Sequence, residues 1–364
     1  MNRNRLLLIA KLIGVVACLY FFIVGIGGMG HAFKLFGRDF AERMLQTTSS
    51  PLVGLFIGIL STALVQSSST TTSIIVGMVA GGAITIDGAI PMVMGANIGT
   101  TITNLLVSLG HITRNQEFRR AFAAATVHDV FNWMAVLVLL PLELATGLLA
   151  KLSGLMAQVF EGVGGLKLGD PLKASTKPVI ELISAACANH PIPVLVVSVL
   201  MTFAMLTLIV KILRSVVLAR VENFFDAHLF KNAGRAMLLG VVLTALVQSS
   251  SITTSLAVPL AGAGILTLRQ IYPYTLGANV GTTVTAILAS LAVAEPSAVT
   301  VAFAHLLFNF CGILIIWPFR AIRNIPLRLA RRFAGLALRA RWIPVLYIVI
   351  GFYLFPLLVI TLLR

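Results

Sequence analysis

One polar octet, present twice in an otherwise apolar chain, constrains the fold more than any other feature. The first copy reads QSSSTTTS over residues 66–73, and the second reads QSSSITTS over residues 248–255, 182 positions later. The segments 58–109 and 240–291 around them align without a gap and are identical at about half of their positions. Shared hydrophobicity alone would not give that level of identity. We therefore interpret the chain as an internal duplication in which both halves kept the octet.

The composition is that of a membrane protein with several spans. The chain has 364 residues, of which 58% are hydrophobic and 11% charged, whereas soluble domains carry about 25% charged residues. The net charge of +15 comes from short basic clusters between apolar runs, a pattern that indicates loops and no nucleic-acid partner. The three cysteines lack metal-ligand spacing, so we expect neither a transition metal nor another cofactor.

Seven apolar runs are long enough to cross a bilayer, which needs about 20 helical residues. The first begins with a basic segment, but it lacks a small-residue cleavage signature and is expected to stay as a span. The segment between 143 and 191 is less apolar and indicates a loop with one amphipathic helix. The expected spans are 11–30, 91–110, 122–140, 193–210, 272–293, 299–317 and 343–363.

The apolar segments that contain the octets are too long for one span, and the polar octet interrupts each segment near its middle. Residues 51–86 form a run of about 35 residues, so two half-helices that meet at the octet, as a re-entrant hairpin, are predicted. Exposed backbone at that depth is tolerated only beside protein or a water-filled cavity, so the octets should face a cavity.

Charge counting fixes the expected orientation. With a cytoplasmic N-terminus and two re-entrant hairpins, the inner loops receive 19 of the 27 Lys and Arg but only 4 of the 12 acidic residues. This distribution follows the positive-inside rule. A single span separates the two halves, so they must have opposite topology, which is typical of secondary transporters with a site near the bilayer midplane.

The sequence thus predicts an all-α polytopic membrane protein built as an inverted-topology repeat, with two re-entrant helical hairpins and about seven full spans. The expected segments are an N-terminal span and extracellular connection (1–50), a first repeat (51–142), an extracellular loop with a linking span and a basic cytoplasmic connector (143–235), a second repeat (236–319), and an Arg-rich amphipathic helix with a C-terminal span (320–364).

A second motif is also duplicated. GANIGTT at 95–101 and GANVGTT at 277–283 each open the span that follows a hairpin. Flanking glycines of this kind allow two backbones to approach closely or a helix to unwind locally.

A histidine followed by an asparagine one turn later occurs in both halves. The pairs are His128 with Asn132 and His305 with Asn309. We interpret these histidines as structural hydrogen-bonding groups between hairpin and scaffold, in preference to a proton relay. Asp129 is expected at the cytoplasmic end of its span, paired with a nearby arginine such as Arg119 or Arg120.

Taken together, these motifs resemble the type II sodium-dependent phosphate cotransporter family. The resemblance rests on the paired QSSS hairpins, the GANxGTT openings and the stretch from EFRRAF at 117–122 to FNW at 131–133, and it covers about residues 51–341. It implies coupling of inward sodium movement to uptake of inorganic phosphate. The animal members' large disulfide-bearing extracellular loop is replaced by a short segment with only Cys187, as expected of a bacterial-type member in the inner membrane.

Oxygen-rich side chains at matched positions form the candidate site. Sodium prefers several oxygen ligands, and phosphate needs hydrogen-bond donors such as hydroxyls and N–H groups at helix starts. No Lys or Arg lies inside either octet, so bound sodium would supply much of the countercharge. The resemblance also places family sodium ligands at these positions. The candidates for sodium are Gln66, Asn97, Thr100, Thr103, Gln248, Ser249, Ala278, Asn279, Thr282 and Thr285. The candidates for phosphate are Ser67, Ser68, Ser69, Ser249, Ser250 and Ser251.

Other functions stay open at this point. No enzyme is favoured, because the sequence offers neither paired carboxylates in an apolar cleft nor a nucleotide-binding glycine loop. The rivals are a sodium-coupled carrier of another small anion or an amino acid, a phosphate exporter, and a phosphate channel. A dicarboxylate or amino-acid site should place Asp or Arg in the cavity, and neither octet contains one. The expected partners are phosphate, sodium, membrane lipids and a second copy of the chain in a homo-oligomer.

Overall fold

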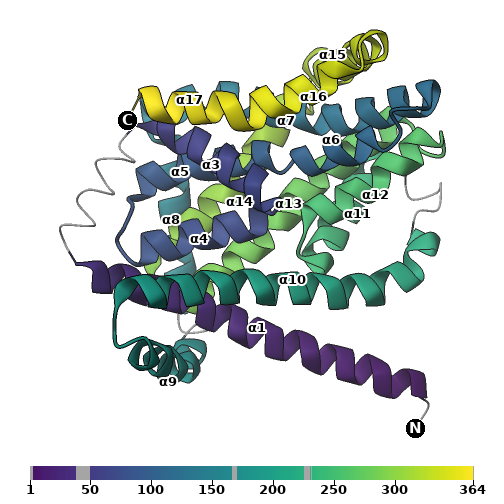
Figure 1. Cartoon of the computed structure of the whole chain (residues 1–364). Helices are drawn as coiled ribbons and strands as arrows, with labels where there is room; N and C mark the ends of the chain where they lie inside the picture. Colours follow the sequence, from purple (N-terminus) through teal and green to yellow (C-terminus); the bar gives the residue numbers. More distant parts are fainter. Residues whose placement is uncertain (1–2, 38–49, 166–169, 225–229, 231, 364) are drawn as a thin grey trace.

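The computed structural model describes residues 3–37, 50–165, 170–224, 230 and 232–363, and this part of the chain is helical without a strand (Figure 1). The expected connection between the first span and the first hairpin, with Arg38, Asp39, Glu42 and Arg43, lies largely outside the described residues. The helices of the first half and the linker are α1 (Arg3–Phe36), α3 (Pro51–Val65), α4 (Ser68–Ala80), α5 (Ile86–Gly99), α6 (Ile102–Leu109), α7 (Asn115–Thr146), α8 (Leu148–Gly162), α9 (Asp170–Ala186) and α10 (Pro191–Phe224). The remainder are α11 (Ala233–Val247), α12 (Ser250–Gly262), α13 (Leu268–Val293), α14 (Pro296–Ile316), α15 (Arg320–Arg339), α16 (Trp342–Val349) and α17 (Phe355–Leu362), with a π-helical turn at Ile350–Leu354.

The prediction of an all-α polytopic membrane protein with seven spans is confirmed. Among the described residues, seven helical segments are long and apolar enough to cross a membrane. They are Ile9–Phe36, Ile86–Leu109, Asn115–Thr146, Pro191–Leu213, Leu268–Val293, Pro296–Ile316 and Trp342–Leu362.

Both octets break a helix at the same point. Gln66 and Gln248 end α3 and α11 in the left-handed conformation, with φ of 54° and 57°. Ser67 and Ser249 then cap α4 and α12, each side chain accepting a hydrogen bond from the backbone N–H three residues on. The break therefore occupies the first two octet residues, and the other six begin the next helix. Insertion of these helix pairs from opposite membrane faces as re-entrant hairpins stays a prediction.

Glycines let the helix before each octet pack directly against the span that follows the hairpin. A Cβ atom added at Gly95 would lie 1.9 Å from the Leu55 carbonyl oxygen, and one at Gly277 would lie 1.8 Å from that of Met237. α3 therefore packs on α5, and α11 packs on α13, at backbone contact in both halves. The first half also unwinds at Thr100, between α5 and α6, whereas α13 is continuous through the equivalent residues.

Two sets of polar contacts join residues that the charge count expects on the same side of the membrane, while the orientation itself stays a prediction. Lys34 and Lys173, both expected outside, lie 3.8 and 3.4 Å from the carboxylate of Glu295, a third outer residue. Arg341 and Asn115, both expected inside, are hydrogen bonded to each other. The two ends of the chain lie at opposite ends of the bundle (Figure 1).

Two regions add detail to the sequence analysis. The segment between the halves contains two helices, α8 and α9, where one was expected, and Phe160 of α8 packs edge-on against Phe303 of α14. α15 buries a row of small and apolar side chains that includes Leu327, Ala330 and Ala334, and it packs against α7.

Candidate functional site

The two octets contact each other. The Ser69 hydroxyl, in the first turn of α4, donates a hydrogen bond of 3.1 Å to the carbonyl oxygen of Gln248, the left-handed residue at the second break. The contact joins residues 179 positions apart. The breaks of the two duplicated halves therefore form one polar region inside the bundle.

The octet hydroxyls fall into two groups. Most of the threonines and the last serine of the first octet donate to carbonyl oxygens of their own helix; for example, the Thr72 and Ser73 hydroxyls lie 2.8 and 2.7 Å from the Ser68 and Ser69 carbonyls. This is the ordinary local bonding of Ser and Thr in membrane helices. Ser68, Ser250 and Ser251 are buried residues whose hydroxyls form no hydrogen bond with a described residue. These hydroxyls are therefore not committed to the local bonding of the first group.

Two helix N-termini lie at the same place. The first turns of α4 and α12 contain the serines, and neither turn holds an acidic side chain. Backbone N–H groups at a helix start lack intrahelical partners and carry the positive end of the helix dipole. This arrangement favours binding of an anion.

In the second half, several of the predicted sodium residues lie together. The Gln248 side-chain oxygen accepts a hydrogen bond of 2.8 Å from the Thr285 hydroxyl. The Thr282 hydroxyl donates to the Ala278 carbonyl oxygen at 3.0 Å, within one turn of α13. The amide, hydroxyl and carbonyl oxygens form an uncharged oxygen set of the kind that suits a hard cation.

The first half does not reproduce this pairing. Gln66 is exposed, and the buried Thr103 hydroxyl, which corresponds to that of Thr285, has no partner among the described residues. Thr100 does donate to the Ala96 carbonyl oxygen at 2.8 Å, as its counterpart Thr282 does to Ala278. The Asn97 amide, however, donates to the Val93 carbonyl oxygen of its own helix at 2.9 Å, whereas that of Asn279 donates to Asn132. The two halves therefore hold the same residues in different side-chain arrangements.

A buried polar chain connects the halves through α7. His128 Nε2 lies 2.6 Å from Asn279 Oδ1, and the Asn279 amide donates to Asn132 Oδ1 at 2.7 Å. Asn132 in turn donates to the Asn97 carbonyl oxygen at 2.6 Å. The candidate residues Asn97 and Asn279 are thus bridged by Asn132, and all of these side chains are buried.

The chain continues to the second hairpin. Asn104 Nδ2 lies 3.3 Å from His128 Nδ1, and Asn104 Oδ1 accepts a hydrogen bond of 3.0 Å from the Thr254 hydroxyl in α12. His128 therefore links hairpin and scaffold through Asn104, in agreement with its expected structural role. Sequence reasoning missed Asn104; its signal is an amide in an apolar helix where the second half has Ala286.

His305 has the opposite environment. Both of its ring nitrogens are buried without a hydrogen-bond partner among the described residues, and so is the side-chain oxygen of Asn309. The Asn309 amide bonds only the His305 carbonyl in its own helix, at 3.0 Å. Of the two duplicated His–Asn pairs, the His128 pair is hydrogen bonded to neighbouring helices, whereas the His305 pair has buried nitrogen and oxygen atoms without a partner among the described residues.

The expectation for Asp129 is wrong. Asp129 lies in the interior of α7, is 0% exposed, and accepts hydrogen bonds from the hydroxyls of Thr101 (2.9 Å) and Tyr347. No arginine of the described part of the chain pairs with it; the Arg120 side chain instead donates to the Gly262 carbonyl oxygen. A carboxylate inside a span is tolerated here because two hydroxyl donors satisfy its oxygens.

Comparisons with known proteins identify the family. A sequence model described as "Na+/Pi-cotransporter" matches residues 21–169 and 200–339. The chain is 35% identical to human sodium-dependent phosphate transport protein 2B over 96% of its length and 65% of that protein. It is 36% identical to protein 2A of Rattus norvegicus over 94% of its length and 66% of that protein. The chain thus spans just under two thirds of these relatives. No solved structure matches it significantly. With most of its length covered by the family, the chain belongs to the Na+/Pi-cotransporters.

Proposed function

We propose that the chain is a secondary active transporter that couples inward sodium movement to uptake of inorganic phosphate. The relatives are named sodium-dependent phosphate transport proteins, and the family description names the same two ions. The observation that carries the proposal is the contact between the octets at Ser69 and Gln248, where two helix N-termini and unpartnered serines converge.

In this proposal, phosphate binds between the first turns of α4 and α12. Serine hydroxyls and free backbone N–H groups donate to its oxygens, without an arginine or lysine in either octet. Weak individual donors allow the anion to leave on the other side of the membrane. The phosphate-binding residues are Ser67, Ser68, Ser69, Ser249, Ser250 and Ser251.

Sodium occupies oxygen sites beside the phosphate. In the second half these oxygens come from Gln248, Ser249, Ala278, Asn279, Thr282 and Thr285. In the first half they come from Gln66, Asn97, Thr100 and Thr103. Bound sodium supplies positive charge next to the serines, so phosphate affinity depends on sodium. This coupling requires no further cofactor.

Alternating access follows from the unequal halves. Inverted repeats exchange conformations when a transporter changes the side to which its site opens. In this structure the Gln248–Thr285 and His128–Asn279 contacts are formed, while their counterparts Gln66–Thr103 and the His305 contact are open. We infer that the site opens to the other side of the membrane when these contacts exchange. In that state the Gln66–Thr103 and His305 contacts are formed, and the Gln248–Thr285 and His128–Asn279 contacts are broken.

The remaining assignments belong to the same proposal, and the basic residues of the loops between the spans support the orientation. The N-terminus is cytoplasmic, and the protein lies in a bacterial inner membrane in contact with lipids and without a nucleic-acid partner. A homo-oligomer is compatible with this arrangement. The chain performs no catalysis.

Uptake into proteoliposomes tests the function. Labelled phosphate is supplied with an inward sodium gradient or an equal potassium gradient, with excess sulfate or glutamate as competitor. Concentrative uptake only with sodium, unaffected by either competitor, supports sodium-coupled phosphate transport. Uptake that ignores sodium would indicate a channel or an exporter working in reverse. Inhibition by glutamate would indicate another anion or an amino acid as substrate.

A further inference from the structure

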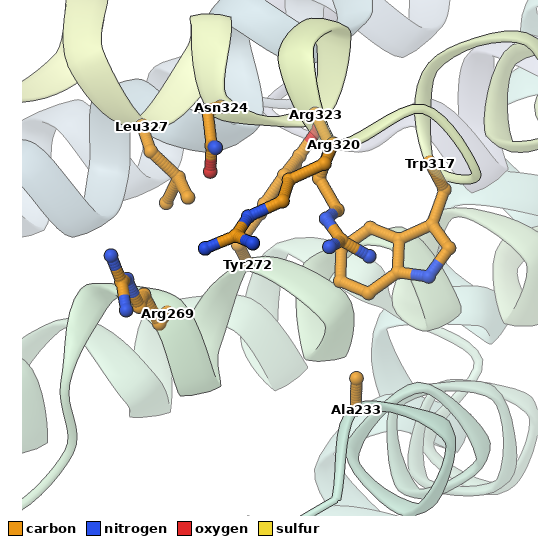
Figure 2. Close-up of a pocket in the computed structure, with 8 residues that line it drawn as sticks. All are labelled: Ala233, Arg269, Tyr272, Trp317, Arg320, Arg323, Asn324 and Leu327. Atoms are coloured by element: carbon orange, nitrogen blue, oxygen red, sulfur yellow. The ribbon is translucent and has the colours of Figure 1, made fainter.

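A basic pocket lies where α13 and α15 begin, and no octet residue lines it. Its volume is about 390 Å³, within the range of ligand sites. Three arginines line it: Arg269 from α13, and Arg320 and Arg323 from α15. Figure 2 shows their guanidinium groups gathered between the two helices. The other lining residues are Ala233, Tyr272, Trp317, Asn324 and Leu327.

The charge of these arginines is not compensated. No Asp or Glu lines the pocket, and none of the three arginines forms an ion pair with a described acidic residue. The first turns of α13 and α15 contain no acidic side chain either, so the positive ends of two helix dipoles add to the charge. Arg269 and Arg320 are exposed to solvent, which screens part of this charge, but three positive charges at two helix starts still favour binding of an anion.

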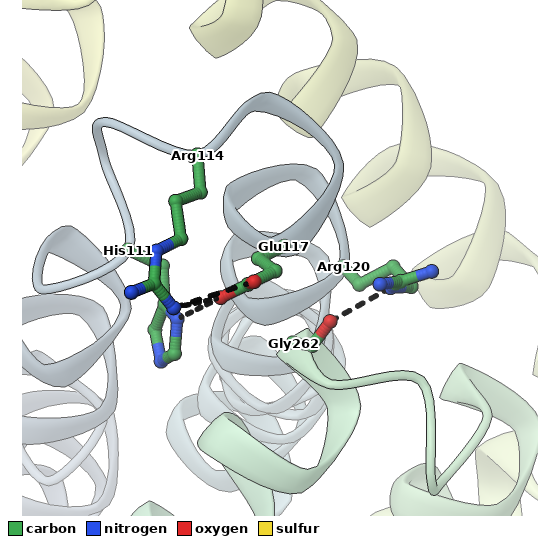
Figure 3. A network of polar contacts seen from close by, with 5 residues as sticks. All are labelled: His111, Arg114, Glu117, Arg120 and Gly262. Carbon is green, nitrogen blue, oxygen red and sulfur yellow. Dashed lines mark hydrogen bonds and ion pairs between the residues drawn. The ribbon is translucent and has the colours of Figure 1, made fainter.

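Two other arginines near the ends of their helices show how the protein can satisfy a guanidinium group. Arg114 lies 3.1 Å from the Glu117 carboxylate, and Arg120 donates to the Gly262 carbonyl oxygen at 2.9 Å (Figure 3). The Arg269, Arg320 and Arg323 guanidinium groups form neither kind of contact with described residues. All three arginines of this pocket thus lack a protein partner, as do Arg119 and Arg331 elsewhere in the described chain.

Tyr272 provides an independent sign of a missing ligand. It is 1% exposed and lines the pocket, yet its hydroxyl has no hydrogen-bond partner among the described residues. Figure 2 shows its side chain running from α13 toward the first turn of α15. A buried hydroxyl without a partner is costly, so it is expected to meet a polar group that the protein does not supply.

The aromatic residues hold the pocket in shape. The Tyr272 and Trp317 rings pack with their centres 5.5 Å apart, and the Arg323 guanidinium lies 4.9 Å from the centre of the Trp317 ring. This cation–π contact fixes Arg323 in the pocket without neutralising it. Tryptophan is also typical of the depth at which lipid headgroups lie.

We propose that this pocket binds the phosphate group of an anionic ligand, separately from the octet site. Guanidinium groups match the oxygens of phosphate with pairs of hydrogen bonds, and three of them suit a ligand with several anionic oxygens. Tyr272 and Asn324 add uncharged hydrogen bonds. The bound anion joins the starts of α13 and α15. The phosphate group comes either from a phospholipid headgroup or from free inorganic phosphate.

Ligand-induced stabilisation in the absence of sodium tests this site. Purified protein in detergent is titrated with inorganic phosphate or with a short-chain phosphatidic acid, and Tm is measured. A ligand that binds the folded state raises Tm with concentration. The experiment contains no sodium and does not use uptake as its readout, so its result is independent of the proposed transport. Native mass spectrometry of the purified protein detects any phospholipid that remains bound and would mask a Tm shift.

Matched variants decide the outcome. Arg320→Gln with Arg323→Gln should raise the apparent Kd at least about tenfold, and Tyr272→Phe several-fold. Arg328→Gln is the control, since Arg328 lies on α15 but bonds carbonyls of its own helix. A response to phosphatidic acid, or retained phospholipid, that the double variant loses identifies a lipid headgroup. A response to inorganic phosphate that the double variant loses identifies the free anion, whereas one that the double variant keeps belongs to another site and counts against this pocket. If the parent, the control and the double variant show the same Tm response to both probes and retain the same amount of phospholipid in native mass spectrometry, the pocket is not an anion site.

Discussion

His128 of the first half and Asn279 of the second half are hydrogen bonded, with Nε2 and Oδ1 2.6 Å apart. Both side chains are buried. The contact places a scaffold histidine against the duplicated GANxGTT motif, which lies inside α13, and it joins residues 151 positions apart. The equivalent histidine, His305, makes no such contact with described residues. Identical local motifs therefore have different energetic roles in this state.

Replacing the two histidines should separate these roles. His128→Ala and His305→Ala remove the same buried ring, but only His128→Ala also leaves Asn279 Oδ1 and Asn104 Nδ2 without their hydrogen-bond partner. Because unsatisfied buried groups cost about 1–3 kcal/mol, His128→Ala should have the lower Tm in detergent. Equal Tm values would show that the His128 hydrogen bonds contribute nothing to stability.

The Ser69 hydroxyl should matter more for phosphate than other hydroxyls of its helix. Ser69→Ala removes the donor that bonds Gln248 across the octets, whereas Ser73→Ala removes a hydroxyl that bonds only its own helix, at 2.7 Å. Loss of about 1 kcal/mol corresponds to about a fivefold increase in the phosphate concentration for half-maximal uptake. The measurement is phosphate-dependent uptake at saturating sodium. Equal half-saturation values for the two variants would remove Ser69 from the site.

Gln248 should control sodium dependence through its side chain. Gln248→Asn keeps a residue that tolerates the left-handed backbone, here with φ of 57°. The shorter side chain loses the contact with Thr285, so the sodium concentration for half-maximal uptake should rise several-fold. Thr285→Val removes the same hydrogen bond from the other side and should act in the same direction. Sodium activation curves that match the parent's for both variants would contradict the assignment.

Much of the fold follows from local sequence. Spans are visible because a bilayer demands long apolar runs, and each such run forms a helix at the expected place. The helix breaks are also local, since a serine N-cap accepting from the backbone three residues on needs only the octet itself. The close approach at Gly95 and Gly277 follows from glycine in a duplicated, otherwise apolar motif.

The contacts inside the site are not local, and the sequence did not predict them. Asp129 was placed near the membrane surface because a charge in a span is costly, but Thr101 and Tyr347, 28 and 218 residues away, satisfy it. Gln66 and Gln248 lie in nearly identical segments, yet only Gln248 meets its threonine. That difference depends on how the two halves pack against each other, which cannot be predicted from a short motif.

Glycine at the hairpin–span contact should tolerate no side chain. Gly277→Ala would place its Cβ 1.8 Å from the Met237 carbonyl oxygen, so α11 and α13 must separate. Such overpacking costs about 1–3 kcal/mol or more, and Tm should fall. Gly154→Ala is the control, because a Cβ there meets nothing within 4 Å, and alanine in a helix interior is about 1 kcal/mol more favourable than glycine. Its Tm should stay equal or rise. If Gly277→Ala is as stable as Gly154→Ala, the backbone contact between the hairpin helix and the span does not exist in the membrane-extracted protein.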